Sequence, residues 1–212
     1  MTSRILAAGL LLAASAVAQE ADSLKVDEKA GTVSFGGKVA QFDKYEQLKG
    51  AIEYLLVMPG GKEYEAIFVA KVDGVALYEG MKKIGLTPGK SGSQDDKIAP
   101  EGGNLKIWVS WKDGDKERKE PAETFVLDAL VNKPMEQKPW VFNGSREVFN
   151  PAEGKMTLGV LNTKNVVALY WNDSTVLVQT GVASKDAHQF KVNKAAVPKS
   201  GTAVRITFEA TK

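Results

Sequence analysis

The sequence predicts an α+β fold: a single domain of mostly antiparallel β-strands, with one or two helices packed on the sheet. Three observations lead to this prediction. Short runs of β-forming residues recur along the chain, and each is ended by glycine, proline or polar residues. Only residues 75–84 place apolar side chains at a clear helical spacing. The length of 212 residues lies within the range of one domain.

The first residues have the pattern of a secretory signal peptide. Arg4 lies in a short basic start, residues 5–12 are apolar, and Ala16–Ala18 form a small-residue cleavage site. The apolar run is too short to cross a bilayer, which takes about 20 such residues. We therefore expect residues 1–18 to be removed after Ala18, and residues 19–212 to form one β-rich domain in the periplasm or outside the cell.

Composition excludes several classes of function. The net charge is only +2, so nucleic acid is not an expected partner. With no cysteine, the chain has no thiolate to act as a nucleophile, hold a metal cluster or carry a lipid anchor. His188 is the only histidine, and no nucleophile-elbow motif accompanies it. We expect no cofactor and no metal, and no embedding in a membrane after cleavage, since no second long apolar run follows the leader.

The first half of the mature chain alternates strand and turn signals. Residues 33–42 predict one or two short strands, and residues 51–58 predict a strand that ends at a proline–glycine turn. Residues 64–72 predict a second strand paired with it. The helix at residues 75–84 is followed by Gly85, a typical helix stop.

A polar segment and a hairpin follow. Residues 90–103 are rich in glycine and serine and show no periodicity, so we expect a mobile surface loop. Apolar residues alternate strictly from Leu105 to Trp111, which predicts a half-buried strand. The Asp113–Gly114 turn predicts a charged return strand that ends near Lys119 and forms an edge of the sheet.

Shorter strand signals complete the chain. Residues 124–130 are apolar without a clear type, and residues 204–209 alternate like an edge strand. The remaining predicted strands lie at residues 140–143, 156–161 and 165–171.

Several stretches, taken in their order, resemble a known family. They are Ile52–Val69, Leu77–Gly89, Ile107–Trp111, Pro134–Ser145, Val167–Asp173 and Gly201–Val204. Each stretch is weak alone, but their order over about residues 51–209 resembles bacterial YdjY-like domain proteins.

The resemblance implies an exported bacterial protein of unestablished biochemical role. Some members of the family are labelled ferredoxin-like, which does not suit this chain because it has no cysteine to hold a cluster. The sequence also departs from the family pattern at Tyr78, where a histidine often occurs, so any role of that histidine is lost or changed here.

Five residues are candidates for a binding site. Asn172 and Asp173 follow an apolar strand, where they either face a ligand or form an Asx turn or a helix N-cap. Glu65 lies beside Glu63 on a predicted strand, as an acid–base pair or as a solvated face. Ser145 follows Asn143–Gly144 in a family-like stretch, and Trp140 follows a proline and either rims a cleft or belongs to the core.

Three functions remain open at this level. The first is a noncatalytic module that binds another envelope component, either a protein or a glycan, since no catalytic constellation is complete. The second is a hydrolase that uses carboxylates such as Glu65 and Asp173, which requires them to converge in one cleft with Asn172 and Ser145. The third is a structural or assembly protein, whose sign would be a broad exposed apolar patch.

Overall fold

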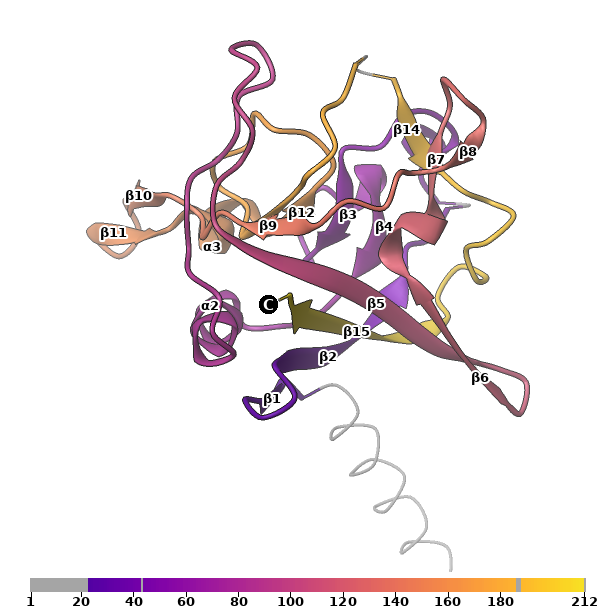
Figure 1. The fold of residues 1–212 in the computed structure, drawn as a ribbon, viewed down its shortest axis with the longest axis horizontal. Helices are drawn as coiled ribbons and strands as arrows, with labels where there is room; N and C mark the ends of the chain where they lie inside the picture. The colour runs from indigo at the N-terminus through magenta and orange to yellow at the C-terminus, as the bar shows by residue number, and fades with distance from the viewer. Residues whose placement is uncertain (1–22, 43, 186–187, 212) are drawn as a thin grey trace, which may run out of the picture.

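A closed ring of eight strands forms the centre of the molecule. The computed structural model describes residues 23–42, 44–185 and 188–211 (Figure 1). Around the ring the strands are β2 (Thr32–Val39), β15 (Ala203–Ala210), β5 (Gly103–Asp113), β9 (Trp140–Phe142), β13 (Val178–Thr180), β12 (Asn165–Ala168), β3 (Tyr54–Val57) and β4 (Ala66–Val69). Strand β4 pairs back onto β2, with Lys38 opposite Val69 and Val39 opposite Phe68, and this pairing closes the barrel.

Smaller elements decorate the barrel. The remaining strands are β1 (Lys25–Asp27), β6 (Lys116–Pro121), β7 (Val126–Asp128), β8 (Lys133–Pro134), β10 (Glu147–Asn150), β11 (Lys155–Leu158) and β14 (Phe190–Val192). The helices are α2 (Gly74–Lys83) and α3 (Gly159–Thr163), with 3-10 turns η1 (Glu46–Lys49), η2 (Glu63–Glu65) and η3 (Ala122–Phe125). Strands β10 and β11 form a hairpin beside the barrel, and β14, β7 and β8 form a separate three-stranded sheet (Figure 1).

The α+β prediction is wrong, because the domain is a mostly β closed barrel that is 14% helical and 40% strand, with only two short α-helices among the described residues. Local periodicity predicted most of the strands but carried no information about which strands pair. The closure depends on the β2–β4 pairing and on two parallel pairings, β3 with β4 and β12 with β13. A closed barrel also fills its interior with its own side chains, so no open sheet face remains for helices to cover.

The interior of the barrel is apolar and close-packed. Phe35 on β2 and Phe208 on β15 meet edge to face with ring centroids 5.4 Å apart. Val204, Ile206 and Phe208 alternate inward along β15 and are buried, which confirms the predicted alternation. The expectation of an edge strand is wrong, however, because β15 lies between β2 and β5 and pairs with both.

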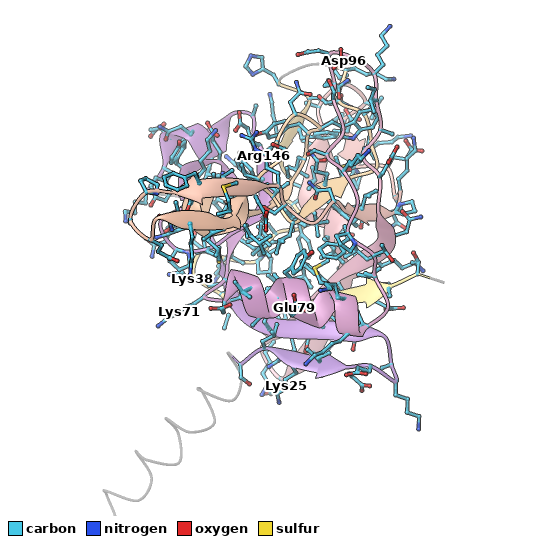
Figure 2. The ribbon with its side chains drawn as sticks, turned by 90° about the vertical axis from the view of Figure 1, so that its left-hand side faces the viewer. Lys25, Lys38, Lys71, Glu79, Asp96 and Arg146 are labelled. Atoms are coloured by element: carbon cyan, nitrogen blue, oxygen red, sulfur yellow. The ribbon has the colours of Figure 1, made fainter. Side chains whose placement is uncertain are left out.

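The predicted helix is confirmed as α2. It begins after Asp73, whose side chain accepts a hydrogen bond of 2.8 Å from the backbone N–H of Ala76. Leu77 and Met81, one turn apart, are buried against the barrel, whereas Glu79 lies on the outer face of the helix (Figure 2). The apolar face of the helix is therefore buried against the barrel, while its polar face stays exposed.

The β10–β11 hairpin exposes apolar side chains. Phe149 and Met156 lie directly opposite each other in its register and are 60% and 52% exposed. Cross-strand neighbours of this kind shield one another only in part, so the pair forms a small apolar surface away from the barrel core.

Two sequence predictions concern membranes and export. Among the residues that the structure describes, no helix is long and apolar enough to cross a membrane. The predicted signal peptide, residues 1–18, lies outside the described residues and stays a prediction.

Candidate binding site at one end of the barrel

Strand direction brings several polar segments to one end of the barrel. Strands β3 and β4 are parallel, so both begin at this end. Strand β12 is antiparallel to β3 and parallel to β13, so β12 and β13 both end there. The residues just before β3 and β4 therefore meet the residues just after β12, although they are far apart in sequence.

A pocket of about 330 Å³ opens at this end and is called the mouth pocket below. Its lining combines apolar, aromatic, amide and charged side chains: Ile52, Glu53, Gln94, Leu169, Tyr170, Asn172, Ser184, Lys185 and Phe190. Ligand sites in β-barrels often lie at such a mouth, and this volume falls at the lower end of their usual range.

Two tyrosines and a carboxylate form a hydrogen-bonded cluster at the mouth. The hydroxyl oxygens of Tyr54 and Tyr170 lie 2.9 Å apart, and the Tyr54 hydroxyl donates to Asp173 Oδ2 at 2.9 Å. Asp173 Oδ1 accepts from the backbone N–H of Thr175 at 2.9 Å and also from the Thr175 hydroxyl. Both carboxylate oxygens of Asp173 are thus engaged in holding the turn after β12.

Burial changes the titration of both tyrosines. It is the main reason that the pKa of Tyr54 lies far above its ordinary value, with the Tyr170 hydroxyl and the Asp173 carboxylate adding to the effect. Burial also raises the pKa of Tyr170 to about 12, and the charge of Asp173 contributes. Both hydroxyls therefore stay protonated at neutral pH and act as hydrogen-bond donors.

A lysine bridges two carboxylates beside this cluster. Lys62 Nζ lies 2.5 Å from Glu53 Oε2 and 3.2 Å from Glu65 Oε2. Burial and the nearby Glu53 charge raise the pKa of Glu65, while Lys62 opposes that rise. The hydrogen bonds with the two glutamates raise the pKa of Lys62 even though its burial acts to lower it.

An arm formed by residues 90–101 closes one side of the mouth pocket. Its strands meet through two isolated bridges, and Asp96 near its tip lies at the opposite end of the molecule from Lys25 (Figure 2). The predicted mobile loop is thus a hairpin with its own backbone pairing. At its base Gly102 has φ +143°, and a Cβ there would lie 2.0 Å from the backbone oxygen of Phe142, so the close approach requires glycine.

A buried glutamine fixes the arm to the barrel. Gln179 on β13 is fully buried, and its Oε1 accepts from the Ser91 hydroxyl at 2.9 Å and from the Gly92 N–H at 3.0 Å. Its Nε2 donates to the backbone oxygens of Tyr170 and Asp173 at 3.1 and 3.2 Å. All of the hydrogen-bonding capacity of this amide therefore joins the arm to the turn after β12.

Gln94 presents an unpaired acceptor at the mouth pocket. Its backbone N–H donates to Asn172 Oδ1, which holds residue 94 against the turn after β12. Among the described residues, its side-chain Oε1 is one of three buried polar side-chain atoms that have no hydrogen-bond partner. Such atoms are rare in folded proteins because an unmade hydrogen bond costs about 1–3 kcal/mol. Gln94 is therefore a lining residue of the mouth pocket whose side-chain acceptor has no partner within the protein.

The structure brings some of the sequence candidates together. Asn172 lines the mouth pocket, and Asp173 supports it through Tyr54 and Tyr170. Glu65 does not line the pocket but is linked through Lys62 to Glu53, which does.

The other two candidates lie elsewhere. Ser145 donates its hydroxyl to the backbone oxygen of Thr175 at 2.7 Å and accepts from the N–H of Val160 at 3.1 Å, so it fixes the backbone. Trp140 is fully buried, and its Nε1 donates to Glu123 Oε1 at 2.7 Å. Within the part of the chain that the structure describes, no group of three or more His, Cys, Asp or Glu side chains is placed to hold a metal ion.

Several residues of the site were not selected from the sequence. Glu53 precedes a short, fully buried strand, as the sequence candidate Glu65 does, and that shared position is the available signal. Tyr54, Lys62 and Gln94 carried no local signal, because their roles depend on the parallel β3–β4 pairing and on the folded arm.

A model of the YdjY domain family matches residues 24–209. The chain belongs to the YdjY domain family. The predicted resemblance is thereby confirmed, and the match begins earlier than about residue 51, so the YdjY domain includes β1 and β2. Comparison with curated proteins and with solved structures gave no match.

Proposed function

We propose that this YdjY domain protein is an exported, noncatalytic binding module, and that the mouth pocket binds a saccharide of the cell envelope. The signal-peptide pattern of residues 1–18 supports export into the periplasm or the medium. The observation that carries the proposal is the mouth pocket, with its unpaired Gln94 acceptor.

The lining suits a saccharide for a physical reason. A sugar ring has apolar C–H faces and a rim of hydroxyl groups, so it needs apolar walls with a few polar partners. Ile52, Leu169 and Phe190 supply the walls, while Gln94 and Asn172 supply amide groups at the same pocket. Glu53 and Lys185 carry opposite charges, so the lining does not select strongly for a charged ligand.

The test is a glycan array followed by calorimetry with any saccharide that binds. The variant Asn172→Ala should weaken binding by on the order of tenfold, since one direct hydrogen bond and the anchor of Gln94 are lost. Asn104→Ala, at an exposed position of β5 outside the pocket, is the matched control and should bind like the natural chain. An array that stays blank under several salt conditions, or equal losses in both variants, would overturn the proposal.

A carboxylate-dependent hydrolase is the second candidate. The pair formed by Glu53 and Glu65, one with a raised pKa, favours it because acid and base catalysts need different protonation states at one pH. Asp173 and Ser145 give no further support to the hydrolase, since both side chains are engaged in hydrogen bonds that hold the backbone. If screening against saccharide substrates finds turnover, Glu65→Gln should abolish it while Glu136→Gln should not. Retention of activity in Glu65→Gln would exclude the mechanism.

A further inference from the structure

A second pocket lies on the outside of the barrel and shares no lining residue with the mouth pocket. It has a volume of about 200 Å³ and is called the Glu123 pocket below. Its walls come from β5, from the β6–η3 junction and from the segment that precedes β9: Lys106, Ile107, Trp108, Pro121, Glu123, Gln137, Lys138, Pro139 and Thr211.

A buried carboxyl group lies among these walls. Glu123 is only 6% exposed, and its Oε1 accepts a hydrogen bond of 2.7 Å from the indole N–H of Trp140. Trp140 is itself fully buried on β9, so it orients the carboxyl group without touching the pocket space. Burial raises the pKa of Glu123 above its ordinary value, and hydrogen bonds from the backbone and from Trp140 oppose that rise only in part.

In the part of the chain that the structure describes, no lysine or arginine pairs with this carboxyl group. Within residues 23–42, 44–185 and 188–211, Glu123 takes part in no ion pair. A carboxylate removed from water without a cation is unstable as the charged form, so a ligand cation would be favoured there.

The two lysines at the pocket each have an acidic neighbour of their own. Lys138 Nζ lies 3.4 Å from Glu136 Oε2, and Lys106 lies opposite Glu209 in the β5–β15 register. Glu209 also accepts a hydrogen bond of 2.8 Å from Trp108 Nε1, which keeps this acid beside the strand. Glu123 is therefore the one acid of the pocket lining, and among the described residues it forms no ion pair with either lysine.

The rest of the lining is suited to an alkyl chain. Trp108, Pro121 and Pro139 present apolar surface, and Gln137 adds a polar amide. We propose that the Glu123 pocket binds a primary ammonium group on an alkyl stem, such as a lysine side chain of a partner peptide, with Glu123 as the counter-ion. Trp140 is the positioning residue for Glu123.

The probe for the test is Nα-acetyl-lysine amide. Its binding is monitored through the NMR chemical shifts of the tryptophan indole N–H groups. We expect saturable shifts of Trp108 and Trp140 and at least tenfold weaker binding of the Nε-acetylated probe, which has lost its charge. Glu123→Gln should also weaken binding at least tenfold, because its amide oxygen still accepts from Trp140 but carries no charge. Glu147→Gln, which removes an exposed acid on β10 outside the pocket, is the matched control and should bind normally.

Three results would overturn the proposal: no saturable binding, equal binding of the acetylated probe, or equal binding by folded Glu123→Gln. If Glu123→Gln does not fold, the comparison of the two probes on the natural chain decides alone. Since the two pockets share no lining residue, failure here leaves the proposed saccharide site untouched, and a blank glycan array leaves this site untouched.

Discussion

The mouth pocket and the Glu123 pocket each have a shielded carboxyl group nearby, and the two groups are stabilised differently. Glu65 beside the mouth pocket shares Lys62 with Glu53, so its charge has a cation within 3.2 Å. Glu123 is more deeply buried and has a neutral indole N–H as its side-chain partner. The difference indicates that the two glutamates at the mouth share a cation of the protein, whereas under our proposal the charge of Glu123 would be balanced by a ligand.

The largest expected effect tests the support of the Glu123 pocket. Trp140→Ala should lower the free energy of unfolding by about 3–5 kcal/mol, because a fully buried indole is replaced by a cavity and Glu123 loses its partner. Urea denaturation measures the change. Trp140→Phe is the control and should lower the free energy of unfolding clearly less. A decrease below about 1 kcal/mol for Trp140→Ala would show that the protein does not depend on Trp140 to stabilise this region.

The corresponding change at the mouth should be smaller. Tyr54→Phe keeps the ring in the core but removes the hydroxyl that contacts Tyr170 and Asp173, so we expect a loss of about 1–3 kcal/mol in urea denaturation. Tyr45→Phe, which changes a tyrosine outside this cluster, should have little effect. If Tyr54→Phe lowered the free energy of unfolding as much as Trp140→Ala, the expected order of the two effects would be contradicted.

The third prediction uses pH to separate the two carboxyl groups. The folded-state pKa of Glu123 is raised, so its stabilising contribution is present below the unfolded-state pKa and is lost as the pH rises through the folded-state value. Relative to the natural chain, Glu123→Gln should therefore be more stable near pH 7 than near pH 4, values chosen to lie on either side of an ordinary glutamate pKa of about 4.3.

Denaturation at both pH values gives this difference, with exposed Glu136→Gln as the control, which should show much less change with pH. An unchanged difference between Glu123→Gln and the natural chain at the two pH values would mean that Glu123 is ionised in the folded protein as readily as in the unfolded chain.

The smallest expected change in stability concerns Lys62. Lys62→Met removes the cation shared by Glu53 and Glu65, and because all three side chains are partly exposed the loss should stay within about 1 kcal/mol. The sharper readout is the pKa of Glu65 by NMR titration, which should rise, since Lys62 lowers it in the natural chain. Lys49→Met, at an exposed surface pair, should leave that pKa unchanged, and an equal pKa in the Lys62 variant would contradict the bridge.

The candidate site illustrates how far local patterns reach. Asn172 and Asp173 were selected from the sequence because polar residues after an apolar strand lie at a strand end, and Asn172 lines the mouth pocket. Glu53, Lys62 and Gln94 were not selected, since they join the site through strand pairing and through the arm. Trp140 was expected at a cleft or in the core, and it lies in the core while orienting a carboxyl group at a second pocket.

The sequence by itself determined the β-rich character, the α2 helix and the YdjY family. These follow from side-chain periodicity and motif order, which are local properties of the chain. Only the tertiary structure decided that the sheet closes, that β15 is internal and that the two glutamates share one lysine. The physical reason is that strand pairing and register are set by contacts between distant segments, which no local pattern encodes.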